Sequence, residues 1–141
     1  KTTWDVIIGD IEGKFWFGVQ DSTDASFFRG DEEEVYDTDE DGNTDYDTEM
    51  GMSYSFFPQH EGDLKDGIQE CEDTLGSWLP KLEEFFERAQ GYNDEILAQA
   101  IGADTSDVRE MVAWYARLEL GRQILKCLQE TGQCCFTADY Y

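Results

Sequence analysis

The segment from Asp31 to Glu49 limits what this chain can fold into more than any other stretch. It holds eleven carboxylates in nineteen residues and contains no Lys or Arg. The whole chain has a formal net charge of -23 at pH 7, so this one segment supplies almost half of the excess negative charge. Like charges placed directly opposite each other destabilise a β-sheet, so folding stability does not explain the arrangement. A positively charged partner explains it.

Carboxylates in this segment recur at every second position on both sides of a Gly-Asn-Thr turn signal at 42–44. Because strand side chains alternate between the two faces of a sheet, this spacing predicts a hairpin that turns at 42–44 and carries six acids on one face. The predicted facing pairs are Asp41–Asp45, Asp39–Asp47 and Asp37–Glu49, with Thr38–Thr48 and Tyr36–Met50 on the opposite face.

The composition indicates a single globular domain, residues 1–141. The residue types AVILMFWYC make up 40% of the chain, which is enough for a hydrophobic core at this length. The balance of 33 acidic against 10 basic residues argues against direct nucleic-acid binding, which needs Lys and Arg to neutralise phosphates, and against anionic membranes. We therefore expect a basic protein partner.

No apolar run reaches the roughly 18–20 residues of a membrane span, and no signal peptide is visible. The four cysteines form no CxxC pair, and we interpret them as reduced, buried thiols of a cytoplasmic protein. Together with the lone His60 they lack the spacing of a zinc site, so we expect neither a metal nor a cofactor.

The order of periodicities along the chain predicts an α+β fold, with a small antiparallel sheet packed against about four helices. Residues 1–58 are mainly β and include the acidic hairpin at 31–49, residues 62–131 are helical, and residues 133–138 return to the N-terminal sheet as a strand. In the first part we predict strands at 4–8, 14–19 and 52–57, a turn at 10–13, and a return of Phe27 and Phe28 to the sheet.

Four helices are predicted from apolar residues spaced three and four positions apart. The first carries the stripe Leu64, Ile68, Cys71 and Leu75 and ends at Gly76. The second follows Ser77, the third covers 94–101 after the capping residue Asn93, and the fourth runs from about 105 to 130.

Residues 94–111 resemble the helix-turn-helix pattern. Ala98 occupies its small-residue position, Gly102 lies in the turn, and Val108 anchors the second helix. In that family the second helix enters the major groove of DNA. Here Arg109 is the one strong base-edge donor among acidic neighbours, so we interpret the motif as a packing unit.

The run Asp37-Thr38-Asp39-Glu40-Asp41-Gly42 resembles the start of an EF-hand calcium loop. Asp45 stands at the ninth position of that loop, but Thr48 stands at the twelfth, where the family has a bidentate Glu. A weak calcium-binding module is therefore one alternative function.

The spacing of the acids also suggests mimicry of nucleic acid. Side chains on one face of a strand are about 6.6 Å apart, comparable with two phosphate steps of about 3.4 Å along one DNA strand. In charge, size and fold type the chain resembles small, acidic, phage-encoded inhibitors, the anti-restriction and anti-CRISPR DNA mimics. The resemblance implies a non-enzymatic inhibitor that blocks the basic nucleic-acid-binding groove of a defence nuclease or a similar protein.

The predicted partner-binding residues are carboxylates of the acidic segment and of the second predicted helix: Asp31, Glu32, Glu33, Glu34, Asp37, Asp39, Glu40, Asp41, Asp45, Asp47, Glu49, Glu83, Glu84 and Glu87. An immunity protein that neutralises a basic toxin is a second alternative. It requires exposed aromatic residues such as Tyr46 or Tyr92 beside the acids. A solvated acidic loop with no partner is the simplest alternative.

Catalysis has little support in the sequence, because the chain has one His, no Gly-rich phosphate loop and no G-x-S-x-G motif. We therefore expect no enzyme. We interpret Trp16, Trp78 and Trp114 as packing residues and not as a ligand-binding stack.

Overall fold

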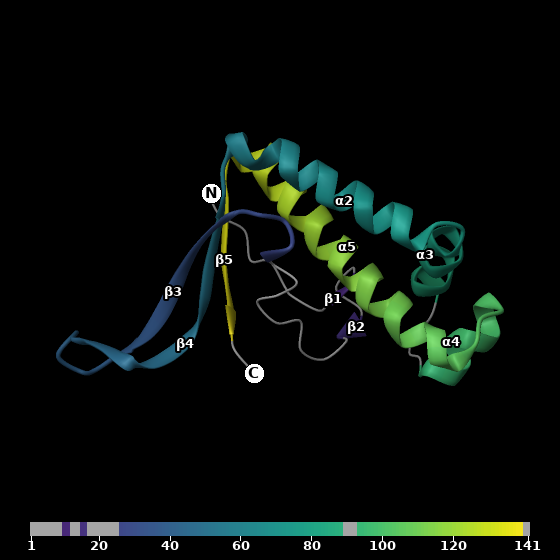
Figure 1. The fold of residues 1–141 in the computed structure, drawn as a ribbon, viewed down its shortest axis with the longest axis horizontal. Coiled ribbons are helices and arrows are strands. Elements are labelled where there is room, and N and C mark those ends of the chain that lie inside the picture. Colours follow the sequence, from purple (N-terminus) through teal and green to yellow (C-terminus); the bar gives the residue numbers. More distant parts are fainter. Residues whose placement is uncertain (1–9, 12–14, 17–25, 89–92, 140–141) are drawn as a thin grey trace.

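The computed structural model describes residues 10–11, 15–16, 26–88 and 93–139 of the chain. It confirms the α+β fold: a three-stranded antiparallel sheet lies beside four α-helices (Figure 1). The elements in chain order are β1 (Asp10–Ile11), β2 (Phe15–Trp16), β3 (Asp31–Thr38), β4 (Thr44–Phe56), the 3₁₀-helix η1 (Pro58–His60), α2 (Glu61–Leu75), α3 (Trp78–Arg88), α4 (Asp94–Ile101), α5 (Thr105–Thr131) and β5 (Cys134–Asp139).

The sheet has the strand order β3-β4-β5, so the predicted return of the C-terminal strand to the N-terminal sheet is confirmed. In the register between β4 and β5, Phe56 lies opposite Cys134 and Tyr54 opposite Phe136. The side chains of these four residues are buried on one face of the sheet, with the Tyr54 and Phe136 rings stacked at 5.4 Å. That face covers the core, and the helices provide its other wall.

Two predictions for the N-terminal part are wrong. The turn predicted at 10–13 does not include Asp10 and Ile11, which form β1 and pair antiparallel with β2 in a separate two-stranded sheet. β2 itself lies within the strand predicted at 14–19. Phe27 and Phe28 lie in a turn before β3 and do not join a strand. The strand predicted at 4–8 lies outside the described residues.

The ring of Phe28 instead packs between α2 and α5. It is fully buried, and it packs where Gly67 of α2 and Gly121 of α5 leave room for its ring. A Cβ atom on Gly121 would lie 2.6 Å from the Phe28 ring, and one on Gly67 would lie 2.9 Å from it. The two glycines therefore permit α2 and α5 to run side by side across the molecule (Figure 1).

The predicted helix ends agree closely with the structure. The Asn93 side-chain oxygen accepts a hydrogen bond from the Ile96 backbone N–H at 2.8 Å, which caps α4 as predicted. Gly102 ends α4 in the left-handed conformation with φ of 75°. Leu97, Ala98, Ile101 and Val108 of the helix-turn-helix pattern are buried, so these positions of the motif pack into the core.

One guanidinium ties three helices together on the surface of the bundle. Arg122 of α5 donates to Glu119 at 2.8 Å and to Glu83 of α3 at 3.0 Å, and it lies 3.8 Å from Glu72 of α2. Burial alone would lower the pKa of Arg122, but the hydrogen bonds and negative charges of Glu83 and Glu119 raise it. The pairing of Arg122 with Glu119, three residues apart on α5, thus extends to two other helices.

Candidate functional site

The acidic segment does form a hairpin, made by β3 and β4, which projects away from the helices (Figure 1). Its tip does not have the predicted register. Asp37 lies opposite Asp45 and Thr38 opposite Thr44, so the loop consists of the five residues Asp39–Asn43. The carboxylate of Asp39 accepts hydrogen bonds from the backbone N–H groups of Asp41 at 3.0 Å and Asn43 at 2.8 Å. Asp39 therefore builds the turn, a role that aspartate commonly takes in turns.

A second departure follows directly below the tip. The register shifts twice between Val35 and Asp37, with Tyr36 opposite Glu49 and Val35 opposite Gly51. Residues 46–48 of β4 stand between the paired positions Asp45 and Glu49, as in a β-bulge. Between Asp31 and Val35, the observed pairing of β3 with β4 has the same register as the predicted hairpin. All five predicted facing pairs at the tip are wrong, namely Asp41–Asp45, Asp39–Asp47, Asp37–Glu49, Thr38–Thr48 and Tyr36–Met50.

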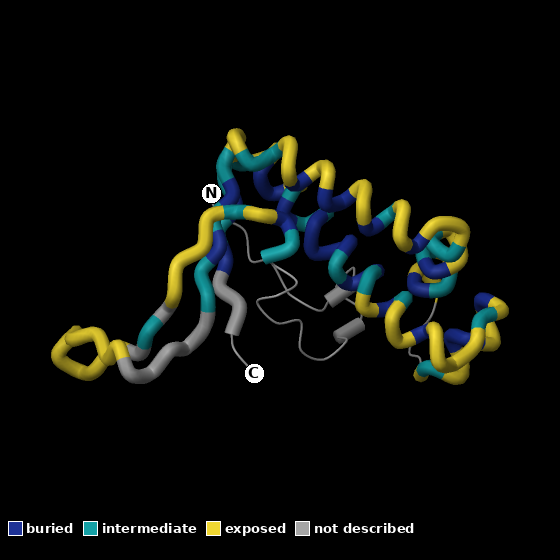
Figure 2. Tube along the Cα trace, in the orientation of Figure 1, coloured by how far each residue is buried: buried dark blue, intermediate teal, exposed yellow. Residues whose placement is uncertain are grey.

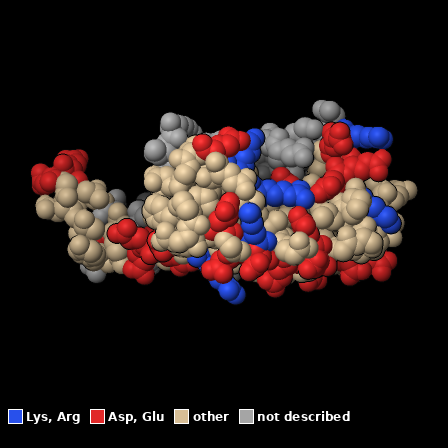
Figure 3. Space-filling model, turned by 90° about the horizontal axis from the view of Figure 1, so that it is seen from above, with Lys and Arg blue, Asp and Glu red and all other residues tan. Residues whose placement is uncertain are grey.

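The described carboxylates of the hairpin are nevertheless exposed to solvent, as Figures 2 and 3 show for its projecting end. Burial is therefore not how the fold accommodates these charges, which water solvates. The exposed residues are Asp31, Glu32, Glu33, Glu34, Asp39, Glu40, Asp41 and Asp45. The side chains of Asp37, Asp47 and Glu49 lie outside those that the structure describes.

Two tyrosines lie among these acids. The rings of Tyr36 and Tyr46 are 5.2 Å apart at an angle of 59°, and Tyr46 is 75% exposed. The Tyr36 hydroxyl donates a hydrogen bond to the carboxylate of Glu34. With neighbouring side chains they line a shallow hollow of about 920 Å³, here called the hairpin hollow, whose described lining residues are Glu32, Glu33, Glu34, Tyr36, Thr44, Tyr46, Met52 and Ser53.

The chemistry of the hairpin hollow favours a guanidinium or ammonium group. Carboxylates form short, charge-assisted hydrogen bonds with such groups, and aromatic rings attract the same cations through their faces. The sequence flagged Tyr46 beside the acids only for the immunity-protein alternative, and Tyr92 lies outside the described residues. The sequence signal that could have indicated the hairpin hollow is the alternation along β3, which places Glu32, Glu34 and Tyr36 on one face of the strand.

The predicted site residues of the second helix lie elsewhere. Figure 1 shows α3 at the opposite end of the molecule from the hairpin. Glu83 accepts a hydrogen bond from Arg122, and Glu84 lies 3.6 Å from Arg88 in an exposed ion pair. Glu87 is exposed. The structure therefore separates the fourteen predicted residues into two groups, and the α3 group is partly neutralised by the chain's own cations.

The calcium-loop pattern occupies the tip of a β-hairpin and not a loop between two helices. Its third residue, Asp39, already uses its carboxylate to hold the turn. Among the described residues, no group of three or more His, Cys, Asp and Glu side chains is arranged to hold a metal ion. The pattern thus lacks the helix–loop–helix setting of that family.

His60 contributes a contact that sequence reasoning missed. Its Nδ1 accepts a hydrogen bond from the Phe57 backbone N–H at 2.9 Å, and its Nε2 lies 3.3 Å from the Asp31 carboxylate. Asp31 is the first residue of β3 and His60 ends η1, so the contact ties the base of the hairpin to the start of the helices. This histidine has a structural role.

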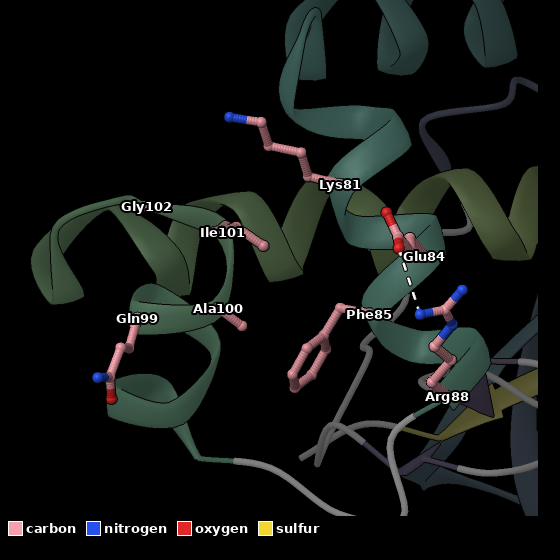
Figure 4. Close-up of a pocket in the computed structure, with 8 residues that line it drawn as sticks. All are labelled: Lys81, Glu84, Phe85, Arg88, Gln99, Ala100, Ile101 and Gly102. Carbon is pink, nitrogen blue, oxygen red and sulfur yellow. Dashed lines mark ion pairs between the residues drawn. The ribbon is translucent and has the colours of Figure 1, made fainter.

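A cleft of about 630 Å³ opens between α3 and α4, and sequence reasoning did not anticipate it (Figure 4). The ring of Phe85 points into the gap between the two helices, while Lys81 extends away from it. Arg88 and Glu84 pair at its side. Its basic residues distinguish it from the acidic hairpin, so it is not part of the same site.

No protein-family model matches the chain, and comparisons with curated proteins and with solved structures find no similar protein. No helix in the described part of the chain is both long enough and apolar enough to cross a membrane.

Proposed function

We propose that this protein is an acidic inhibitor that blocks the basic nucleic-acid-binding groove of a defence nuclease or a similar nucleic-acid-binding protein. The hairpin formed by β3 and β4 is the part that enters the groove. The observation that carries the proposal is the hairpin hollow, where three exposed glutamates stand beside the rings of Tyr36 and Tyr46.

The whole-chain charge supports the same class of partner. A net charge of -23 repels nucleic acids and attracts basic surfaces, and it accelerates association with them at low salt. The projection of the hairpin from the body of the protein gives it access to a recessed groove (Figure 1). The mechanism is competitive occlusion: Lys and Arg side chains that otherwise bind phosphates bind the hairpin carboxylates.

The broken register changes the proposed means of mimicry. A regular ladder of six carboxylates with phosphate-like spacing is not what the hairpin presents at its tip. Recognition instead rests on Glu32, Glu33 and Glu34, on the loop carboxylates, and on aromatic contacts with guanidinium groups. An immunity protein against a basic toxin remains the second candidate, and the exposure of Tyr46 favours it, because exposed aromatics anchor specific interfaces.

Capture followed by competition distinguishes the two candidates. The protein is immobilised and exposed at low salt to nuclease-treated bacterial lysates, and the captured proteins are identified and purified. Each purified protein is then tested for displacement of its own fluorescent DNA or RNA by the acidic protein. The proposal expects displacement that is competitive with nucleic acid. Capture of a toxin whose nucleic-acid binding is unaffected, or simultaneous binding of both ligands, contradicts it.

A further inference from the structure

A second hollow lies at the helical end of the molecule, where the end of α2, the start of α3 and the first turns of α5 meet. It has a volume of about 320 Å³, and the proposed function makes no use of it. Its described lining residues are Thr74, Leu75, Trp78, Asp107, Glu110, Met111 and Trp114, and it is here called the tryptophan hollow.

The walls of the tryptophan hollow are apolar and polarisable. Trp78, Met111 and Trp114 are half-buried and pack against the core, while each contributes surface to the hollow. Two indoles and a polarisable thioether line one small site, and aromatic rings attract organic cations. Packing against the core explains why these side chains are half-buried. It does not explain why all three also line one hollow.

Both indoles already hold a cation from their own chain. The ammonium of Lys81 lies 4.8 Å from the centre of the Trp78 ring, and the guanidinium of Arg117 lies 4.5 Å from that of Trp114. Neither cation is among the described residues that line the hollow. Both indoles therefore attract cations within their own chain, and both also line the hollow.

Two carboxylates complete the site. Asp107 and Glu110 are exposed, and they stand three residues apart on α5, so they lie on the same side of the helix. Within the described part of the chain neither makes an ion pair with a basic side chain. Their mutual repulsion would be relieved by a single positive charge in the hollow beside them.

We propose that the tryptophan hollow binds an alkylammonium group. Such a group matches both parts of the site, because its charge pairs with Asp107 and Glu110 while its carbon atoms contact Trp78, Met111 and Trp114. An anion is repelled by the carboxylates. A hard metal ion takes oxygen ligands and gains nothing from the two indoles and the thioether. A neutral apolar molecule leaves the two carboxylates without a partner.

A free quaternary ammonium ion and the lysine side chain of another protein share this chemistry, and titration calorimetry of the full chain separates them. The probes are choline, its neutral carbon analogue 3,3-dimethylbutan-1-ol, and Nα-acetyl-lysine amide, all at constant ionic strength of about 150 mM to screen the net charge. We expect choline or the lysine amide to bind at least about tenfold more tightly than the neutral alcohol. Tighter binding of choline identifies a small ligand, and tighter binding of the amide identifies a lysine of a partner.

Matched variants separate the site from general attraction to a negatively charged protein. The double variant Asp107→Asn, Glu110→Gln leaves the tryptophans and the core intact, and we expect it to weaken binding about fivefold or more. The control Glu95→Gln, Glu130→Gln removes the same charge from exposed positions outside the hollow and is expected to bind as the wild type does. Equal binding of the neutral alcohol, equal losses in both double variants, or no binding of any probe overturns the proposal. None of these outcomes depends on the function of the hairpin.

Discussion

At the scale of single residues, Arg122 forms the contacts that hold several carboxylates of the helices in the fold. Arg122 binds Glu119 and Glu83 and lies near Glu72, and these carboxylates come from three helices. Glu119 is the buried charged residue of the described core, at 8% exposure. A buried carboxylate needs its cation, because an uncompensated charge away from water is costly.

Replacement of Arg122 by Met is therefore expected to destabilise the fold by about 1–3 kcal/mol, since it removes the guanidinium between Glu72, Glu83 and Glu119 and sets these three carboxylates against one another. Arg88→Met removes an exposed pair with Glu84 and is the matched control, with an expected effect within about 0.5 kcal/mol. Urea unfolding followed by circular dichroism measures both. Similar midpoints for the two variants would show that Arg122 has no special role.

Cys134 gives the fold a dependence on alkaline pH. Burial raises the pKa of this thiol above its ordinary value of 9.0, and the neighbouring thiols of Cys127 and Cys135 raise it further. Below pH 9 the thiol is protonated in both the folded and the unfolded chain. Above pH 9 the unfolded chain loses this proton while the folded chain keeps it, so the free energy of unfolding falls as the pH rises.

The contribution of Cys134 to that fall is about 1.4 kcal/mol per pH unit above pH 9. Stability is measured for the wild type and for Cys134→Val at intervals from pH 7 to pH 10.5. The difference between the two proteins is expected to be constant up to about pH 9 and then to shift in favour of the variant. Parallel profiles over the whole range would rule out the raised pKa.

At the scale of elements, the packing of α2 against α5 depends on the space that glycine leaves for Phe28. Gly121→Ala would bring a Cβ within 2.6 Å of the Phe28 ring and 2.9 Å of Ile68. We expect a loss of about 1–3 kcal/mol from overpacking, despite a gain of about 1 kcal/mol in helix propensity.

Gly62→Ala provides the control for this substitution, because Gly62 also lies in a helix and nothing stands within 4 Å of an added Cβ. It is expected to leave stability unchanged or to raise it by up to about 1 kcal/mol. Thermal unfolding of both variants tests the packing of the Phe28 ring between α2 and α5. A stabilised Gly121→Ala protein would show that α2 and α5 do not meet closely at Phe28.

The elements also show how far the sequence alone leads. The stripe of Leu64, Ile68, Cys71 and Leu75 and the cap at Asn93 predicted α2 and the start of α4, because both signals are local. The hairpin was predicted from alternation, but its tip was not, because the carboxylate of Asp39 takes over the turn and a bulge absorbs the remaining residues. Alternation of residue types in the sequence predicts which side chains face each other only where the strand pairing continues without a bulge.

Long-range partners account for the rest of what sequence reasoning missed. The sequence predicts Glu83 as a residue that binds another protein, yet Glu83 accepts a hydrogen bond from Arg122, 39 residues away in the same chain. The tryptophan hollow combines residues of α2, α3 and α5 that no local pattern links. Trp78 and Trp114 pack against the core as predicted, whereas the ligand proposed for the tryptophan hollow departs from the interpretation that these residues bind none.

At the scale of the whole molecule, the charge of -23 opposes compactness through self-repulsion. Raising sodium chloride from 20 to 300 mM shortens the screening length and is expected to raise the thermal midpoint by about 3–8 °C. Scanning calorimetry measures the shift, with an uncharged osmolyte as the control for general solvent effects. A midpoint that falls with salt would mean that attractive ion pairs outweigh the repulsion.

Two matched triple variants separate binding of the basic partner by the hairpin from attraction by the total charge. The hairpin triple variant is Glu32→Gln, Glu33→Gln, Asp41→Asn, which spares Asp39 and its turn. The helical triple variant, Glu70→Gln, Glu95→Gln, Glu130→Gln, removes the same charge from exposed positions on the helices.

The measurement is the dissociation constant of each protein for a captured partner, by fluorescence anisotropy at about 150 mM salt. We expect the hairpin triple variant to bind at least about thirtyfold more weakly than the wild type, and the helical triple variant to lose less than about threefold in affinity. Equal losses of affinity in the two variants would contradict this expectation, because the acidic hairpin would then contribute to binding only through its share of the net charge.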